Sequence, residues 1–268
     1  MTGDIIHLAA FVPVIPVLNR WENIHKSIFP FTTCTDLVVW NKPGTLGSTL
    51  GLPKFTKFLR YSVFIPDYLI GVFVGLFISD ASLTMATSNS NPRMAFKQSI
   101  INFPFFWSTF MLLSHYIAGM PYQDWTTLKV NGKTYLAIRF DTRAYPVLHL
   151  IHELFFVNGR KVISPELYHY LNPTALAYWI MSDGAFKGGG LILCTDCFTV
   201  PEVVLLMNIL TIRYGFICTI NMVAGLPRIY ISRRSMVSLR KIVGPHMLEF
   251  SNYKLYGLRG LKRNVTSY

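Results

Sequence analysis

Acidic side chains are scarce in this sequence. Its 268 residues contain 13 Asp and Glu against 25 Lys and Arg, which gives a formal net charge of +12. The basic excess continues to the end of the chain, where Glu249 is the sole acid after residue 226. An excess of this size suits a polyanionic partner, either a nucleic acid or an anionic membrane surface.

Cysteine is rare as well. The four cysteines are too few and too irregularly spaced for the disulfide scaffold of a small secreted protein. Cys194 and Cys197 form an isolated CxxC without a second pair or suitably spaced histidines, so we interpret them as ordinary buried thiols rather than zinc ligands. The first residues include Asp4 and lack a small-residue cleavage site, which argues against a secretory signal peptide.

Long apolar runs are few, although 51% of the residues are hydrophobic. The runs are Ile5–Leu18, Tyr68–Ile78 and Ile100–Met120, and only the third approaches the roughly 20 residues that a membrane-spanning helix needs. Pro104 and His115 interrupt it. We therefore expect buried helices of a compact domain and no membrane insertion. The competing interpretation is a membrane protein with a basic face.

Two segments of the chain share one layout, from Asp67 to about Val157 and from Pro173 to about Tyr253. Each begins with an apolar helix that ends in Ser-Asp followed by a small residue, and continues through a short polar stretch. The order helix, strands, helix, strands, helix then occurs in both, which predicts an α+β domain duplicated in tandem. The expected later elements are Met94–Ser99, Pro104–Tyr116, Thr134–Phe140 and Tyr145–Phe156 in the first copy, and Leu191–Phe198, Pro201–Tyr214, Pro227–Ser232 and Met236–Leu248 in the second.

The start of the chain does not fit the repeat. Residues 32–53 carry Pro, Gly, Ser and Thr at the density of a loop or linker. We interpret residues 1–60 as an N-terminal extension, which is either upstream coding sequence fused to the domain or a small packing subdomain. The first repeat is then expected over residues 61–165 and the second over residues 166–268.

The aspartates at the two helix ends, Asp80 and Asp183, form the informative pair. A carboxylate is unfavourable at the C-terminal end of a helix, because the helix dipole is negative there. Either residue alone is best explained as a surface residue. Two of them at equivalent positions of a repeat predict a site in which a divalent cation relieves the repulsion. Mg²⁺ suits carboxylates together with phosphate, and a site of this kind supports phosphodiester cleavage.

The segments Phe73–Ala81 and Leu176–Gly184 resemble the two LAGLIDADG motifs of homing endonucleases. The passage Asn158–Pro165 is similar to the region between repeats in the branch encoded in organellar introns, and Cys194–Thr199 is similar to its strand-to-helix junction. Arg228–Ile231 and the closing Tyr-Lys-Leu at 253–255 fit the same branch. The resemblance extends from residue 61 to the end of the chain.

The two motifs depart mildly from the family pattern. Ala81 stands where Gly is usual, and Tyr178 occupies a position where a small residue is expected. Gly75 and Ala177 still allow two helices to approach closely, because small residues spaced along a helix hold the backbones less far apart. Both acids are retained.

The resemblance implies two pseudo-symmetric αββαββα repeats whose curved antiparallel sheets form a saddle over duplex DNA. It implies a monomeric, mitochondrial enzyme that hydrolyses both strands of a long target with Mg²⁺, for which Mn²⁺ is expected to substitute. It further implies metal ligation at the motif ends, with Gln98 and Asp196 as matching polar residues near the metals and Arg143 and Arg233 or Arg234 in the basic role. Strand position selects the DNA-facing candidates. The catalytic candidates are Asp80, Asp183, Gln98, Asp196, Arg143, Arg233 and Arg234, the metal candidates are Asp80, Asp183, Ala81 and Gly184, and the DNA-binding candidates are Arg93, Lys97, Lys129, Lys133, Arg139, Lys187 and Arg228.

Two other functions are compatible with this fold. One is an RNA maturase that assists splicing of its own intron, with or without DNA cleavage, since a basic surface also serves RNA. The other is a transcriptional regulator without chemistry, which would lack at least one of the acids. The retention of Asp80 and Asp183 favours cleavage, because RNA binding has no use for a repulsive pair of carboxylates.

Overall fold

The first repeat and the second have the same order of elements. The computed structural model describes residues 49–87, 89–127, 134–157 and 159–257. The first unit consists of α4 (Asp67–Ile78), β1 (Ala81–Thr84), β2 (Arg93–Ser99), α5 (Phe103–Leu113), β3 (Tyr122–Thr127), β4 (Thr134–Asp141) and α6 (His149–Phe155). The second consists of α8 (Pro173–Asp183), β7 (Gly184–Lys187), β8 (Gly190–Leu193), α9 (Val200–Tyr214), β9 (Cys218–Val223), β10 (Leu226–Ile231) and α10 (Met236–Val243).

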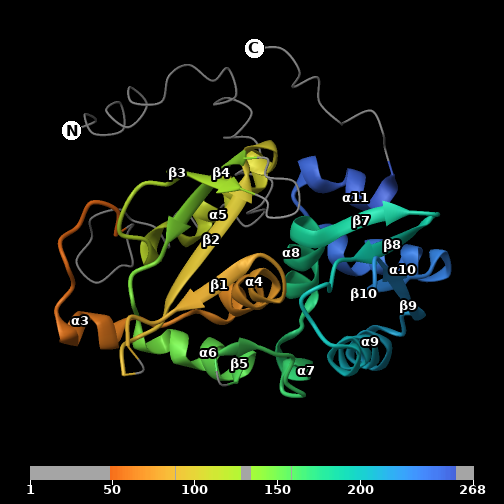
Figure 1. Ribbon diagram of the computed structural model, residues 1–268, viewed down its shortest axis with the longest axis horizontal. Helices are drawn as coiled ribbons and strands as arrows, with labels where there is room; N and C mark the ends of the chain where they lie inside the picture. The colour runs from red at the N-terminus through yellow and green to blue at the C-terminus, as the bar shows by residue number, and fades with distance from the viewer. Residues whose placement is uncertain (1–48, 88, 128–133, 158, 258–268) are drawn as a thin grey trace, which may run out of the picture.

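Each unit contains one four-stranded antiparallel sheet. The strand orders are β1-β2-β4-β3 and β7-β8-β10-β9, so the topology of the second sheet repeats that of the first. The sheets lie on either side of the central helices α4 and α8, as Figure 1 shows. The predicted α+β duplication of an αββαββα unit is confirmed.

Three short α-helices and a small hairpin lie outside this pattern in the described part of the chain. They are α3 (Lys57–Ser62) before the first unit, the hairpin β5 (Phe156–Val157) and β6 (Arg160–Lys161) with α7 (Leu167–Tyr170) between the units, and α11 (Tyr253–Tyr256) after the second. The 3₁₀ turn Glu249–Ser251 leads into α11. The connection between the units therefore runs from α6 through a tight hairpin into the second motif helix.

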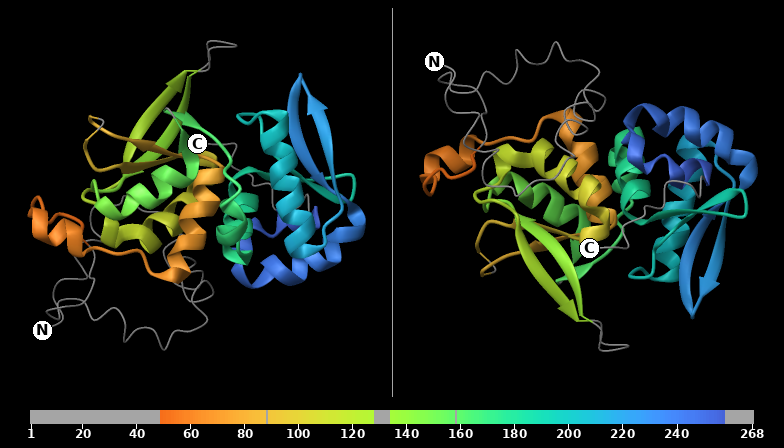
Figure 2. Two further views of the ribbon diagram at one scale, coloured as in Figure 1. Left: turned by 90° about the horizontal axis from the view of Figure 1, so that it is seen from below. Right: turned by 90° about the horizontal axis from the view of Figure 1, so that it is seen from above.

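The two motif helices α4 and α8 pack side by side in the same direction (Figure 2). A Cβ added to Gly71 would lie 2.4 Å from Oδ1 of Asn172, the N-cap of α8. One turn further on, a Cβ on Gly75 would lie 2.4 Å from the carbonyl oxygen of Ala175 and 2.7 Å from Cβ of Tyr178. Glycine at these positions lets the two backbones approach, and the large residue Tyr178 fits because Gly75 opposes it.

The apolar run Tyr68–Ile78 forms a buried helix rather than a membrane span. Every residue of α4 from Gly71 to Ile78 is buried. Within the described ranges, no helix has both the length and the apolar character to cross a membrane. A helix that is hydrophobic on all sides is typical of the centre of a domain, where sheets and helices cover it.

The face of each sheet that meets the helices is apolar. In the first unit, the ring of Phe96 on β2 stacks on Phe106 of α5 at 5.9 Å and contacts Phe140 of β4 at 5.5 Å. Full burial of such a ring contributes about 2–3 kcal/mol. Because side chains alternate along a strand, the neighbours of these residues point to the opposite face. That face carries no covering layer from the described helices, and we call it the open face (Figure 2).

Several boundaries differ from those predicted, and three of them by three or more residues at the C-terminal end of the element. Strand β8 ends at Leu193 rather than at Phe198, because Thr195 begins a tight turn that is closed by a hydrogen bond from the amide of Phe198, 3.0 Å long. Helices α5 and α10 end earlier than expected and continue as single 3₁₀ turns, Ser114–Tyr116 and Gly244–His246. Glycine and proline at 244 and 245 explain the second of these ends.

Candidate active site

The two aspartates lie where the motif helices meet the first strands of the sheets. Asp80 follows the end of α4 by two residues, and Asp183 is the last residue of α8. The next residues, Ala81 and Gly184, begin β1 and β7. Gly184 has no room for a side chain, since a Cβ there would lie 2.6 Å from the carbonyl oxygen of Ile180. The predicted metal residues therefore adjoin one another at the junction of the two repeats.

Hydrogen bonds from both repeats hold the carboxylate of Asp80. The Ser182 hydroxyl, on α8, donates to Oδ2 of Asp80. The Gln98 amide, on β2, donates to the same oxygen at 2.5 Å. Asn102 in turn donates to Oε1 of Gln98 at 3.0 Å, which fixes the orientation of the Gln98 amide. The site thus contains Gln98, as predicted, together with two residues that the sequence did not indicate.

Two lysines occupy matching places beside the aspartates. Nζ of Lys161, on β6, donates to the carbonyl oxygen of Ser79 at 2.9 Å and to that of Ala81 at 3.4 Å. Nζ of Lys254, on α11, donates to the carbonyl oxygens of Met181 and Ser182 at 2.6 and 2.9 Å. Each ammonium group therefore satisfies carbonyls at the end of one motif helix, where positive charge is favourable.

The lysines and aspartates share one electrostatic environment. Burial lowers the pKa of Lys254 to about 8 and also lowers the pKa of Lys161, while the nearby aspartates oppose both shifts. Burial and the charge of Asp80 raise the pKa of Asp183 to about 7, and the two lysines oppose that shift. A half-buried carboxylate next to a second carboxylate is thus an unfavourable arrangement that additional positive charge would stabilise.

The donor set fits a hard divalent cation. Both predicted ligands are carboxylates, and within the described residues no group of three or more His, Cys, Asp and Glu side chains forms a closed metal site. A site with two carboxylates keeps coordination positions for water and for phosphate oxygens, which is how Mg²⁺ is commonly bound. The raised pKa of Asp183 is the observation that agrees with this, because a bound cation would reverse it.

Asp196 does not occupy the position in the second repeat that Gln98 occupies in the first. Its carboxylate pairs with the guanidinium of Arg228 through two hydrogen bonds, 2.7 and 2.5 Å long. The reason is the early end of β8, which puts Asp196 in a turn instead of on a strand. Cys197 in the same turn is exposed and Cys194 is half-buried, so these thiols are less buried than we expected.

The arginines that were predicted for the basic role lie at the other end of the sheets. Strand β1 leaves the aspartate, β2 returns, and β4 runs outward again, so residues after β4 emerge far from Asp80. Arg143 there donates to the carbonyl oxygens of Thr49, Leu52 and Pro53 at 2.9, 2.7 and 3.0 Å. Arg233 follows β10 in the same way and packs against Gly189, in the turn between β7 and β8, and the adjacent Arg234 is exposed.

The basic side chains that the structure places beside the aspartates are those of Lys161 and Lys254. Each comes after the third helix of its repeat, and this repeated placement is the signal that a closer comparison of the two copies would have found. Both lysines lie in segments that resemble the family. The arginines that were predicted for the basic role instead follow the last strand of each sheet.

Five of the DNA-binding candidates fall within the described residues. The pairing of the strands places all five on the open faces of the sheets. Arg93, Lys97 and Arg139 share one face of the first sheet, since Lys97 pairs with Arg139 and residues two apart point the same way. Two of them already have acidic partners, Lys97 with Asp124 at 3.1 Å and Arg139 with Asp141 at 2.7 Å. Arg228 and Lys187 lie on the open face of the second sheet, and Lys129 and Lys133 fall outside the described residues.

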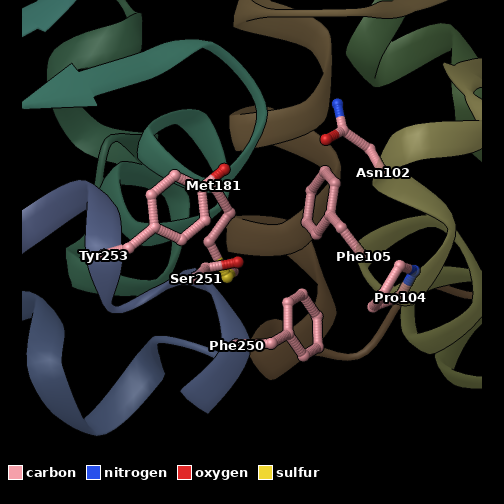
Figure 3. A pocket seen from close by; sticks show the side chains of 7 residues that line it. All are labelled: Asn102, Pro104, Phe105, Met181, Phe250, Ser251 and Tyr253. Atoms are coloured by element: carbon pink, nitrogen blue, oxygen red, sulfur yellow. The ribbon is translucent and has the colours of Figure 1, made fainter. Parts of the chain in front are cut away.

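A small cavity separates the repeats next to this site. It has room for about one water molecule, at a volume of about 10 Å³, and is lined from both repeats (Figure 3). Asn102 and Phe105 border it on the first-repeat side, and Met181 and Tyr253 on the other. Side chains of both repeats therefore nearly fill the space at this point of the junction.

Comparisons with known proteins agree with this geometry. The LAGLIDADG DNA endonuclease family matches residues 70–239, which is more than half of the chain. This chain belongs to that family.

Two curated relatives and one solved structure show the range of similarity. The cytochrome b mRNA maturase bI2 of Debaryomyces hansenii is 30% identical over 196 residues, covering 70% of this chain and 73% of the relative. The intron-encoded endonuclease ai4 of Dictyostelium discoideum is 34% identical over 143 residues, covering 52% of this chain and 86% of the relative. The homing endonuclease I-WcaI, solved bound to its DNA recognition sequence, has the same fold, with a TM-score of 0.68 at 22% identity, covering 76% of this chain and 95% of that chain.

Proposed function

We propose that this chain is a site-specific homing endonuclease that makes a double-strand break in a long DNA target. The observation that carries the proposal is the meeting of Asp80 and Asp183 at the ends of two paired helices, linked by the hydrogen bond from Ser182 to Asp80. Membership of the family and the intron-encoded endonuclease among the relatives support it. Both repeats are present in one chain, so a monomer supplies the complete pair.

In this proposal Asp80 and Asp183 would hold Mg²⁺, or Mn²⁺ in its place. When bound, the ion would supply Lewis acidity, which lowers the pKa of water and offsets charge on phosphate oxygens. Gln98 and Ser182 orient the Asp80 carboxylate by donating to its Oδ2. Lys161 and Lys254 hold positive charge beside the reacting phosphates, which favours the more highly charged transition state. In each strand, hydrolysis would form a bond between the water oxygen and phosphorus and break the bond between phosphorus and one sugar oxygen, which leaves as a hydroxyl after taking up a proton from the water.

The open faces are proposed to bind the duplex in its major groove. Arg93 and Lys187 are exposed on these faces and are proposed to contact phosphates or base edges directly. Arg139 and Arg228 are held by carboxylates, so their guanidinium groups would be presented in fixed orientations. Fixed orientation favours base recognition over general attraction, because a bidentate contact requires a planar donor at a defined angle.

Cleavage of a plasmid that carries the junction from which the host intron is absent tests this function. With Mg²⁺, the wild type is expected to linearise the plasmid at one site, and Asp80→Asn or Asp183→Asn should abolish cutting. Both variants should remain folded, because each substitution removes a charge from a repulsive pair. Failure of the wild type to cut any junction plasmid would contradict the proposal.

A second function, RNA maturation, is favoured by one specific observation. Two relatives that each match 70% of this chain, from Debaryomyces hansenii and Saccharomyces cerevisiae, are named cytochrome b mRNA maturase bI2. Splicing of the host intron RNA with Asp183→Asn protein distinguishes the two functions. Splicing that is unchanged in this variant would show that the maturase role exists and does not need the carboxylate pair. We also propose a mitochondrial location, which the cytochrome b relatives support.

A further inference from the structure

A basic groove lies at the outer end of the first sheet, outside the pair of aspartates. Its volume is about 490 Å³, and α3 forms one wall while the turn between β1 and β2 forms the other. Figures 1 and 2 show α3 next to this turn. We call it the α3 groove and define it by Lys57 and Arg60 of α3, Thr84 and Arg93 of the hairpin, and Asn89 of the turn.

The lining of the α3 groove has the chemistry of a phosphate-binding surface. Three cationic side chains, Lys57, Arg60 and Arg93, contribute to it, and none of its lining residues is acidic. Within the described ranges, none of the three belongs to a salt bridge. Nε of Arg60 is buried without a hydrogen-bond partner. Three cations without an acid among them give the groove a positive charge, which fits a polyanion.

The α3 groove continues the open face of the first sheet. Thr84 and Arg93 are paired across β1 and β2, and Arg93 points to the same face as Lys97, four residues along the strand. Strand β2 carries this face from Arg93 to Ser99, a length of roughly 20 Å at about 3.3 Å per residue. A duplex seated on the sheet would therefore reach the groove with its outer phosphates.

Helix α3 is fixed in place at both ends. Arg143 holds the preceding segment through the carbonyls of Thr49, Leu52 and Pro53, and its guanidinium lies 4.5 Å from the ring centre of Phe55. After the helix, the Tyr116 hydroxyl donates to the carbonyl oxygen of Phe64 at 2.8 Å. A wall that is anchored on both sides can present Lys57 and Arg60 without first being ordered.

The outer end of the second sheet is built differently from that of the first. The strands β7 and β8 are joined by the tight turn Lys187–Gly190, whereas eight residues separate Thr84 from Arg93 in the first unit. The two ends of the DNA interface are therefore unequal.

We propose that the α3 groove binds the sugar–phosphate backbone of duplex DNA beyond the part of the target that the sheets cover, at the first-repeat end. This rests on the proposed endonuclease function. The groove adds affinity without sequence information, since phosphate contacts position a protein and do not specify bases. It makes the footprint asymmetric, longer at one end of the target than at the other.

Binding to shortened duplexes tests this assignment. Junction duplexes are trimmed from one end or from the other, and their dissociation constants are measured in EDTA, so that no strand is cut. For the wild type, we expect removal of base pairs from the first-repeat end to weaken binding about tenfold. Removal of the same number of base pairs from the opposite end should have no effect. In Lys57→Ala/Arg60→Ala this difference should disappear, and the slope of log K against log salt should fall by about 2, at roughly 0.9 per phosphate contact.

Lys54→Ala/Lys241→Ala is the matched control, because it removes the same charge from exposed positions outside the groove. It should bind every duplex as the wild type does, apart from a small uniform loss. Equal weakening by the two double variants would overturn the proposal, since net charge alone would then explain it. Loss of binding to the intron RNA in Lys57→Ala/Arg60→Ala, with unchanged dependence on DNA length, would overturn it in favour of RNA. Failure of the wild type to bind any junction duplex would instead overturn the endonuclease function itself.

Discussion

Ser182, on the second motif helix, donates its hydroxyl hydrogen bond to the carboxylate of Asp80, which belongs to the first. The equivalent residue Ser79 behaves differently, because its hydroxyl donates to the carbonyl oxygens of Gly75 and Leu76 in its own helix, at 2.9 and 3.2 Å. The two halves of the site are therefore unequal, although the fold is pseudo-symmetric. Asp80 receives donors from both repeats.

We predict that Ser182→Ala slows the cutting of one DNA strand more than that of the other. A hydrogen bond to a charged group is worth about 1.5–3 kcal/mol, which corresponds to roughly a tenfold or larger loss of rate where the bond positions the reacting group. With supercoiled plasmid carrying the target, nicked circles should accumulate before linear product. Ser79→Ala is the control and should leave the ratio of the cutting rates of the two strands unchanged. Equal slowing of both strands by Ser182→Ala would contradict the prediction.

Lys254 is predicted to be needed for cleavage beyond its part in stability. Lys254→Met removes two hydrogen bonds, to Met181 and Ser182, and takes positive charge away from Asp183. Removing a donor that stabilises a transition state costs about 10²–10³ in rate, and the unpaired carbonyls cost about 1–3 kcal/mol of stability. Single-turnover cleavage and a thermal melt of the same sample separate these effects. Lys241→Met, at an exposed position of α10, should change neither.

Arg143→Ala is expected to leave the chemical step unchanged. The Arg143 side chain holds the segment before α3 and has no contact with either aspartate among the interactions of the described residues. The single-turnover rate at saturating protein should stay within about twofold of the wild type, while limited proteolysis around residues 49–56 should become faster. A loss of rate comparable to that of Lys254→Met would restore the catalytic role that the sequence suggested.

Local patterns were enough to predict most of this fold. The apolar run of α4, the Ser-Asp ends and the recurrence of the element order predict a duplicated α+β domain, and the structure confirms it. The capping box of α9 is also readable, since the side chain of Glu202 accepts from the backbone amide of Thr199 at 2.7 Å. These features depend on residues that are close in sequence.

The candidate site was harder to predict, because its residues are brought together by strand direction. Asp196 matches Gln98 when the two copies of the repeat are aligned, yet a turn after Leu193 places it beside Arg228. Arg143 follows β4 by two residues, but β4 ends on the side of the sheet that is remote from Asp80. Lys161 and Lys254 reach the site from segments with no fixed spacing to the motifs. Position within a sheet depends on topology, which spacing alone does not give.

Acid is predicted to destabilise the protein partly through His115. Burial lowers the pKa of His115 to about 4, from an ordinary value of 6.5. Above pH 6.5 the residue is neutral in both states. As the pH falls from 6.5 towards 4, the unfolded chain takes up a proton that the folded chain excludes, so the free energy of unfolding falls by up to about 1.4 kcal/mol per pH unit. Urea melts give the free energy of unfolding at pH 7 and at pH 5, and the difference between these two values should be smaller in His115→Gln than in the wild type. An unchanged difference would mean that other groups dominate.

The approach of α4 and α8 is predicted to depend on Gly75. In Gly75→Ala the new Cβ would lie 2.4 Å from the carbonyl oxygen of Ala175, a backbone atom that cannot turn aside. The helices must separate, which should cost about 1–3 kcal/mol of stability and also move Ser182 away from Asp80. Cleavage should therefore fall more than the loss of folded protein explains, as measured by activity at a temperature where a thermal melt shows the variant to be folded. Gly119→Ala is the control, since no heavy atom lies within 4 Å of its new Cβ. If Gly75→Ala lowered stability but cleaved normally, close packing of the helices would not be what aligns the two carboxylates.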